Sequence, residues 1–340
     1  MAASIQSKTK ISLGVVPTHL KFVGGLVPDD DGRLPRGDDG QLLVVANMAK
    51  LMDASLVRID CCQVPFFPGV NTDDVADLVN GLKDLNLEVH LILMVGGADP
   101  MNPADEDSVV GMLVDGLKAA KQHGIVHVSS TSVEEWMKEG ATRKDGAEFE
   151  AAVKQNIQVH TRAVREADLD GSSVKAWHIE FLRGGEFQTF TDVGRCWQFV
   201  RGCNEALGQP FFRVMVDAAH CGDSSLSIPE NEAIIQEIAE AGALGIFHAS
   251  AKTTRGCLST DDGWIGALMT ACARTGALEI VFVEVVHHED PAREGLRQLD
   301  PGHGLDTTDG RSYDQTVLDG LADVGRRLNN LATRNILPTA

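Results

Sequence analysis

The sequence lacks a long apolar segment. No run of apolar residues reaches the ~20 residues that a helix needs to cross a bilayer. The opening Met1–Val16 also has no apolar stretch long enough for the hydrophobic part of a secretory signal. We therefore expect no membrane partner and a location in the cytoplasm.

Cysteine pairs at the spacing of metal or redox motifs are also missing. The seven cysteines are irregularly spaced, Cys61 and Cys62 are adjacent, and no Cys-x-x-Cys occurs. This usage argues against a disulfide framework and against a zinc ribbon, and it fits a reducing compartment.

Positive charge is scarce. The 30 lysines and arginines are outnumbered by 49 aspartates and glutamates, which gives a net charge of −19. A field of this sign repels phosphate backbones, so we expect no nucleic-acid partner.

What the sequence does contain is a regular alternation of strand-like and helix-like segments. The strand-like segments are continuous apolar runs, which is typical of parallel strands covered by helices. Eight such runs occur, at 11–16, 55–60, 87–95, 125–130, 174–182, 211–217, 244–250 and 278–286. Amphipathic helices are expected between them, at 73–86, 107–123, 147–168, 192–207, 229–241, 260–275 and 313–332.

Eight such units without a composition break predict an α/β fold, a single (β/α)8 TIM barrel over residues 1–340. An open doubly wound sheet is disfavoured because no Gly-x-Gly-x-x-Gly follows the first apolar run. Long βα loops are expected at 17–41 and 287–311, over the catalytic face.

Four consecutive strand-like runs each end in an ionisable residue. These residues are Glu180, Asp217, His248 and Glu284, separated by 37, 31 and 36 positions. The similar pitch predicts that the four side chains lie at one level, at the carboxyl ends of the strands, where barrel enzymes carry their sites. One carboxylate at a strand end is usually structural, whereas four converging groups favour a functional site.

Three carboxylates that converge repel one another unless a cation lies between them. Oxygen ligands with one nitrogen suit Mn²⁺, Mg²⁺ or Co²⁺ better than a tetrahedral zinc site, so we expect one divalent ion, with Mn²⁺ preferred. Four protein ligands leave about two octahedral positions for substrate oxygens.

Several polar residues follow these strand ends. His220 stands three residues after Asp217, Arg183 and Glu186 follow Glu180, and Arg255 follows His248. We interpret them as groups that bind substrate hydroxyls or orient ligands, with surface ion pairing as the alternative. Trp264, after the turn that follows Arg255, is a further candidate for the substrate pocket.

These motifs resemble the xylose isomerase-like superfamily, most closely its ketose 3-epimerase and sugar isomerase branch. The matching segments are IEFLRGGEFQTF (179–190), MVDAAH (215–220), FHASAKTTRGCLSTDDGW (247–264) and IVFVEVV (280–286). In order along the chain, these segments carry Glu-Arg-Glu, Asp-x-x-His, a His and an Arg followed by a turn and a Trp, and a final Glu. The same elements occur in the same order in that branch. The likeness covers the second half of the chain.

The resemblance implies a divalent-metal-dependent sugar isomerase or epimerase with a carbohydrate substrate. Glu180, Asp217, His248 and Glu284 would hold the metal. One of the two glutamates would remove a proton next to a carbonyl and the other would return it, through a metal-stabilised enediolate. His220, Arg255 and Glu186 would bind sugar oxygens. Barrels of this kind often form homo-oligomers, although no interface is readable in the sequence.

Three other functions compete with this one. The superfamily contains dehydratases and lyases that act on cyclitols, sugar acids or oxidised C-glycosides with the same metal and the same proton abstraction. A DNA-repair endonuclease would need more histidine ligands on the early strands and a basic surface. A non-enzymatic scaffold would have lost the four-residue set, which is intact here.

Overall fold

The centre of the protein is a sheet of nine strands in which all paired neighbours run parallel. The structure is a computed structural model that describes residues 5–17, 26–250, 263–285, 294, 298 and 312–340. The strands are β1 (Ser12–Val15), β2 (Cys61–Phe66), β3 (Glu88–Leu93), β4 (His127–Ser130), β5 (Ala176–Ile179), β6 (Phe212–Val214), β7 (Val216–Asp217), β8 (Ile246–Ala249) and β9 (Ile280–Val283).

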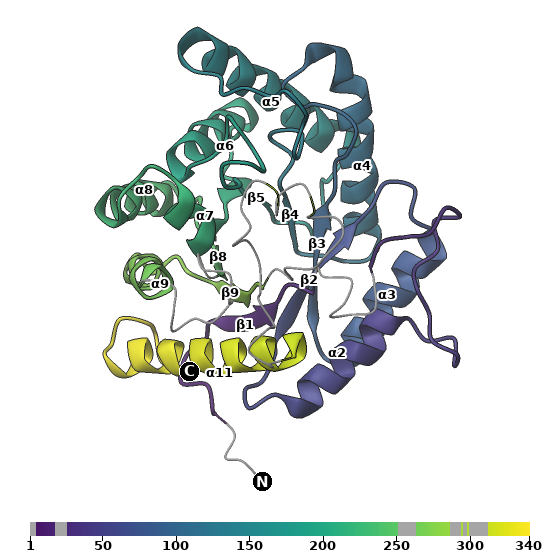
Figure 1. Ribbon diagram of the computed structural model, residues 1–340, viewed down its shortest axis with the longest axis vertical. Helices are drawn as coiled ribbons and strands as arrows, with labels where there is room; N and C mark the ends of the chain where they lie inside the picture. The colour runs from purple at the N-terminus through teal and green to yellow at the C-terminus, as the bar shows by residue number, and fades with distance from the viewer. Residues whose placement is uncertain (1–4, 18–25, 251–262, 286–293, 295–297, 299–311) are drawn as a thin grey trace.

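The sheet closes into a barrel because β6 and β7 are two parts of one strand. Only Met215 separates them along the chain. β6 pairs with β5 and β7 pairs with β8, so the two ends of the strand order β6-β5-β4-β3-β2-β1-β9-β8-β7 meet at Met215. Figure 1 shows the ring of strands with helices around it. The predicted α/β TIM barrel is therefore confirmed.

The helices form the outer layer of the barrel. They are α2 (Leu43–Ala54), α3 (Thr72–Asp84), α4 (Glu106–Gln122) preceded by the short η1 (Pro103–Asp105), α5 (Gly146–Ala167), α6 (Val193–Leu207), α7 (Ala218–Asp223), α8 (Ile228–Glu240), α9 (Trp264–Arg274) and α11 (Tyr313–Thr333). Seven of them match the predicted segments, with ends that differ by a few residues. In the described part of the chain, no helix is both long and apolar enough to cross a membrane.

The predicted position of the second strand, 55–60, is wrong. Ser55 ends α2, and the apolar residues after it belong to the connection from that helix to the barrel. The strand begins at Cys61, which lies level with Gly14 of β1 and Glu88 of β3. Register with the two neighbouring strands therefore decides its position, and a local apolar run does not show that register.

Two helices are not predicted by the sequence pattern. α2 has no side-chain cap at Leu42, no acidic residue in its first turn and no basic residue in its last turn, so the usual start and stop signals are missing. α7 has six residues and begins at Asp217, whose side chain accepts a hydrogen bond from the backbone N–H of His220. A helix of six residues is too short to show the helical periodicity of apolar residues in its sequence.

The inside of the barrel is only partly apolar. A small cluster that includes Cys61, Met215 and Phe282 fills part of it, apart from the main core between strands and helices. Buried polar residues fill the rest, among them Gln63, His90, Ser129 and His178. Gln63 of β2 contacts Ser129 of β4, and the His90 ring meets the Phe282 ring across the barrel. These strands are not neighbours in the sheet, so the contacts run through the interior.

His160 of α5 is a second kind of buried polar group. It is fully buried between the Trp177 and Phe199 rings. Its Nδ1 donates to the carbonyl oxygen of Asn156, at 2.9 Å, and its Nε2 lies 2.8 Å from the hydroxyl of Ser132. Burial lowers the pKa of His160 to about 4, because the charged imidazole is poorly solvated there.

We expect His160 to make the fold sensitive to acid. The folded pKa lies below the unfolded value near 6.5, so the unfolded state takes up the proton first as the pH falls. Stability should therefore be lost between pH 6.5 and 4. Denaturant unfolding at pH 7 and pH 4.5 should show that wild type loses roughly 2–3 kcal/mol more than His160→Gln over this interval. An equal loss in both proteins would contradict the assignment.

Candidate metal centre

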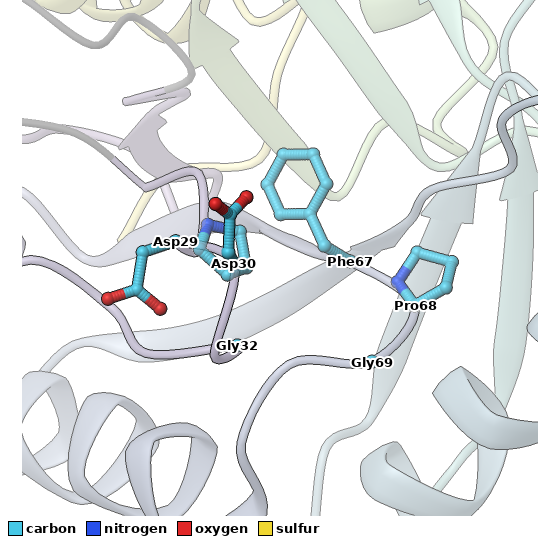
Figure 2. A pocket seen from close by; sticks show the side chains of 7 residues that line it. Asp29, Asp30, Gly32, Phe67, Pro68 and Gly69 are labelled. Atoms are coloured by element: carbon cyan, nitrogen blue, oxygen red, sulfur yellow. The ribbon is translucent and has the colours of Figure 1, made fainter.

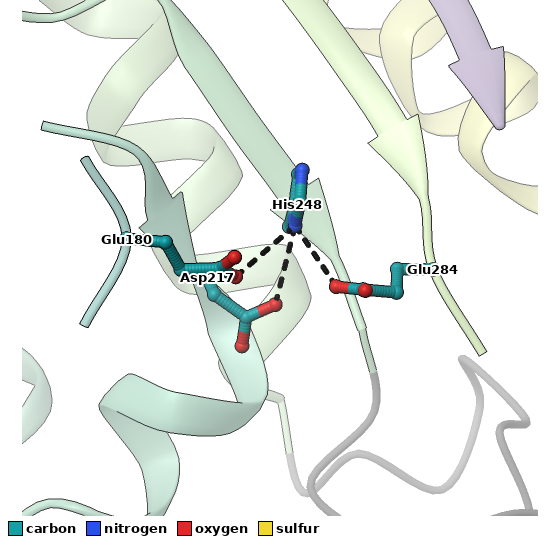
Figure 3. A group of neighbouring side chains, drawn as sticks. All are labelled: Glu180, Asp217, His248 and Glu284. Carbon is teal, nitrogen blue, oxygen red and sulfur yellow. Dashed lines mark hydrogen bonds and ion pairs between the residues drawn. The ribbon is translucent and has the colours of Figure 1, made fainter. Parts of the chain in front are cut away.

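Four ionisable side chains meet at the carboxyl ends of consecutive strands. Glu180 follows β5, Asp217 ends β7, His248 lies in β8 and Glu284 follows β9. One possible ligand atom from each lies within 4.8 Å of all the others, and Figure 3 shows the three carboxylates gathered around the imidazole. Three of the residues are buried, and the side chain of Glu284 is 16% exposed. The structure thus brings together the four residues selected from the sequence.

The Nδ1 atom of His248 is the centre of this group. It lies 2.9 Å from Oε2 of Glu284, 3.3 Å from Oε1 of Glu180 and 3.8 Å from Oδ2 of Asp217. Figure 3 shows that the other ring nitrogen points away from the carboxylates. That nitrogen, Nε2, lies 2.8 Å from Oε1 of Gln63.

Burial and charge act in opposite directions on these groups. Burial raises the pKa of Glu180, although the neighbouring His248 opposes this. Burial lowers the pKa of His248, but the charges of Glu180 and Glu284 and the hydrogen bond to Glu284 outweigh it, so the pKa is raised well above its usual value. The arrangement thus favours the charged form of the imidazole, which is the one group of the four that can carry positive charge.

The donor set fits a divalent metal ion. The three carboxylates supply oxygen ligands and His248 supplies one nitrogen, a combination suited to Mn²⁺, Mg²⁺ or Co²⁺. Oε1 of Glu180 is buried and makes no hydrogen bond. It forms ion-pair contacts with the imidazoles of His248 and His220. A metal ion would satisfy this oxygen and relieve the repulsion between the carboxylates.

Asp217 is held in place from two sides. Its Oδ1 accepts a hydrogen bond from the backbone N–H of His220 at 2.7 Å, where it caps α7. Its Oδ2 accepts a hydrogen bond from the hydroxyl of Ser250, which follows β8. Ser250 and Gln63 are contacts that the sequence analysis missed. No local pattern identifies either residue, because their partners come from other strands.

His220 lies beside this group, and Glu186 is close enough to His220 for its charge to act on that imidazole. Nε2 of His220 is 3.7 Å from Oε1 of Glu180. Burial lowers the pKa of His220, but Asp217, Glu180 and Glu186 outweigh it and the pKa is raised. Oε1 of Glu186 accepts a hydrogen bond from the indole N–H of Trp136 at 3.1 Å.

The other expected site residues have different surroundings. Arg183 forms an ion pair with Asp223 of α7, at 3.2 Å, which agrees with the alternative interpretation of this arginine. Trp264 is the first residue of α9 and packs against the main hydrophobic core. Arg255 and the loop at 287–311 lie outside the described residues, apart from Glu294 and Gln298, which are exposed.

Glu134 holds the segment that carries Glu186. Its carboxylate is buried and accepts backbone N–H bonds from Gln188, Thr189 and Phe190, at 2.8–3.0 Å. The backbone N–H of Met137 donates to the carbonyl oxygen of Glu186 at 2.9 Å. The segments after β4 and β5 are thus joined by several bonds, a function that the sequence does not assign to Glu134.

A separate surface pocket lies on the loops after β1 and β2. Its volume is 330 Å³, and Figure 2 shows the side chains that line it, from Pro28, Asp29, Asp30, Gly32, Phe67, Pro68 and Gly69. None of the four gathered residues belongs to it. Arg33 and Arg36 hold the described part of the first loop against Asp74 of α3, at 2.8 and 2.5 Å.

Comparisons with known proteins agree with this fold. The structure of a D-allulose 3-epimerase from Methylomonas sp., in complex with D-allulose, is 15% identical in sequence and matches with a TM-score of 0.70. The match covers 95% of this chain and 99% of that chain. An L-ribulose 3-epimerase matches with 14% identity, 96% of each chain and a TM-score of 0.69. The IolI protein with a bound zinc atom matches with 10% identity, 96% of this chain, 100% of that chain and a TM-score of 0.57.

At these identities the similarity establishes the fold. The chain has the TIM-barrel fold of these proteins. The sequence matches no family profile, and no curated protein matches it. The chemistry of the site must therefore be argued from its own residues.

Removal of one member of the four should abolish tight metal binding. We expect His248→Ala and Asp217→Ala to weaken divalent-ion binding by on the order of 10²-fold, because affinity depends on ligand number and charge. Calorimetric titration of the apo protein with Mn²⁺ measures this. His123→Ala, at the end of α4, is the matched control and should bind like wild type. Unchanged affinity in both ligand variants would argue against a metal at this position.

Proposed function

We propose that the protein is a divalent-metal-dependent sugar isomerase or epimerase. The observation that carries this proposal is the group of Glu180, Asp217, His248 and Glu284 at the mouth of a barrel whose structural neighbours include ketose 3-epimerases. We assign the four residues as ligands of one metal ion, with Mn²⁺ preferred. A carbohydrate is the proposed substrate.

The bound metal ion would polarise a carbonyl oxygen and an adjacent hydroxyl oxygen of the sugar. Proton transfer belongs to the two glutamates. Glu180 and Glu284 approach His248 from opposite sides in Figure 3, so a sugar held at this centre lies between two carboxylates. One carboxylate removes the proton from the carbon beside the carbonyl and the other returns it.

The remaining polar groups would bind the sugar. We assign this role to His220, which lies next to Glu180, and to Glu186, which accepts a hydrogen bond from the indole of Trp136. We assign Arg255 and Trp264 to the same pocket from the sequence motif. Binding energy from these contacts orients the carbon acid toward its base.

The competing endonuclease function receives no support from the early strands. His127 is the first residue of β4, and its ring stacks on His90 of β3 and contacts His178 of β5. His90 and His178 are buried, His127 starts its strand, and none of the three belongs to the group of four at the mouth. The net charge of −19 also disfavours DNA.

The proposal is tested by solvent deuterium exchange with a panel of ketoses. We expect the Mn²⁺-loaded protein to incorporate deuterium at the carbon beside the carbonyl of its substrate, and to form the epimer or the isomer. Mass spectrometry and NMR of the recovered sugar measure both. Loss of water, or release of an aglycone, would instead assign the protein to the dehydratases and lyases of the superfamily.

The same assay tests the two glutamates. Glu180→Gln and Glu284→Gln keep one oxygen ligand but cannot accept a proton, so we expect turnover to fall by ~10²-fold or more while some metal is retained. Glu279→Gln is the matched control, because Glu279 lies just before β9, at the opposite end of that strand from Glu284, and pairs with Arg213 of β6. Near wild-type rates in both site variants at full metal content would remove the glutamates from the chemistry.

A further inference from the structure

We propose that Gln63 is a positioning residue that fixes which ring nitrogen of His248 binds the metal. The inference rests on the proposed function, because it assumes a metal ion among the four gathered residues. Gln63 lies in β2, on a strand that supplies none of those four, and its side chain is fully buried inside the barrel.

The first step is the contact itself. Oε1 of Gln63 lies 2.8 Å from Nε2 of His248, and both side chains are almost inaccessible to solvent. The opposite ring nitrogen, Nδ1, faces the carboxylates of Glu180, Asp217 and Glu284. The imidazole is thus held between an amide on one side and the candidate metal position on the other.

The second step is the direction of the hydrogen bond, which follows from the other end of the amide. Nε2 of Gln63 lies 3.1 Å from the hydroxyl oxygen of Ser129 and 3.6 Å from the sulfur of Met215. A thioether sulfur can only accept, so the network places the amide NH₂ group there and the amide oxygen against His248. Because that oxygen can only accept, Nε2 of His248 must carry a proton.

The third step is the consequence for the metal. A neutral imidazole has one proton, and a proton on Nε2 leaves the lone pair on Nδ1 free to bind a cation. Without Gln63, the buried Nε2–H would lose its acceptor, at a cost of about 1–3 kcal/mol. The tautomer with the proton on Nδ1 would then gain population, and its N–H would point at Glu284 instead of a metal.

The choice of an amide also fits the charge of the site. Three carboxylates already surround Nδ1, and Gln63 adds an acceptor for Nε2 without adding a fourth negative charge. Ser129 and Met215 fix the far end of the amide, so the acceptor is oriented before any metal binds. Gln63 acts through its hydrogen bond to the imidazole ring, which defines its role as positioning.

The test compares two variants at this position in the full chain. Gln63→Leu removes the acceptor, and we expect it to weaken Mn²⁺ binding by roughly 10–100-fold in calorimetric titration, the usual effect of losing a partner of a metal-binding histidine. Gln63→Glu keeps an acceptor for Nε2–H and should restore most of the affinity. Val64→Ala removes core packing on the neighbouring position of β2, whose side chain is buried in the main core, and leaves the contacts of Gln63 in place, so it is the control and should bind like wild type.

A spectroscopic readout separates this role from a purely structural one. In ¹⁵N–¹H spectra of the protein loaded with diamagnetic Mg²⁺, wild type should show one imidazole proton on His248, on Nε2 and slow to exchange with solvent, and Gln63→Leu should exchange that proton faster. Metal-loaded wild type with the proton on Nδ1 would overturn the inference even if the variants fail to fold.

The affinities separate the two proposals. Equal Mn²⁺ affinities of wild type and a folded Gln63→Leu would overturn the role of Gln63 and leave the metal assignment intact. A wild-type protein that binds no divalent ion would overturn both proposals.

Discussion

The mutual repulsion of three carboxylates is the constraint on which this site depends. Glu180, Asp217 and Glu284 lie around one imidazole nitrogen at the mouth of the barrel, and two of the three are buried. Such a group is stable only with a cation at its centre. His248 is the one member of the group that can carry positive charge, and a divalent ion is proposed to lie between its Nδ1 atom and the carboxylates.

The surrounding structure meets this constraint with fixed partners. Asp217 caps α7 and accepts from Ser250, His248 is held by Gln63, and Glu134 binds the segment that carries Glu186. Each partner is a buried polar group with its hydrogen-bonding capacity directed at a neighbour. The polar part of the barrel interior thus supports the mouth, while the apolar part around Phe282 contributes packing.

Much of the architecture was predictable because parallel barrels repeat one unit. Seven of eight strand positions and seven helices followed from apolar runs and their spacing, as did the set of four strand-end residues. The second strand was misplaced because a connection such as Leu56–Ile59 is as apolar as a strand, and only pairing with Gly14 and Glu88 selects Cys61–Phe66. Helix α2 was missed because it has no capping signals.

The sequence by itself determined which chemical groups end the last four strands, since a period of one βα unit fixes both their level and their side of the barrel. Only the tertiary structure decided how those groups are oriented. The hydrogen bonds between His248 and Gln63 and between Ser250 and Asp217 each join residues of different strands. A hydrogen bond depends on distance and angle, and closure of the barrel sets both, so no local pattern in the chain could reveal these partners.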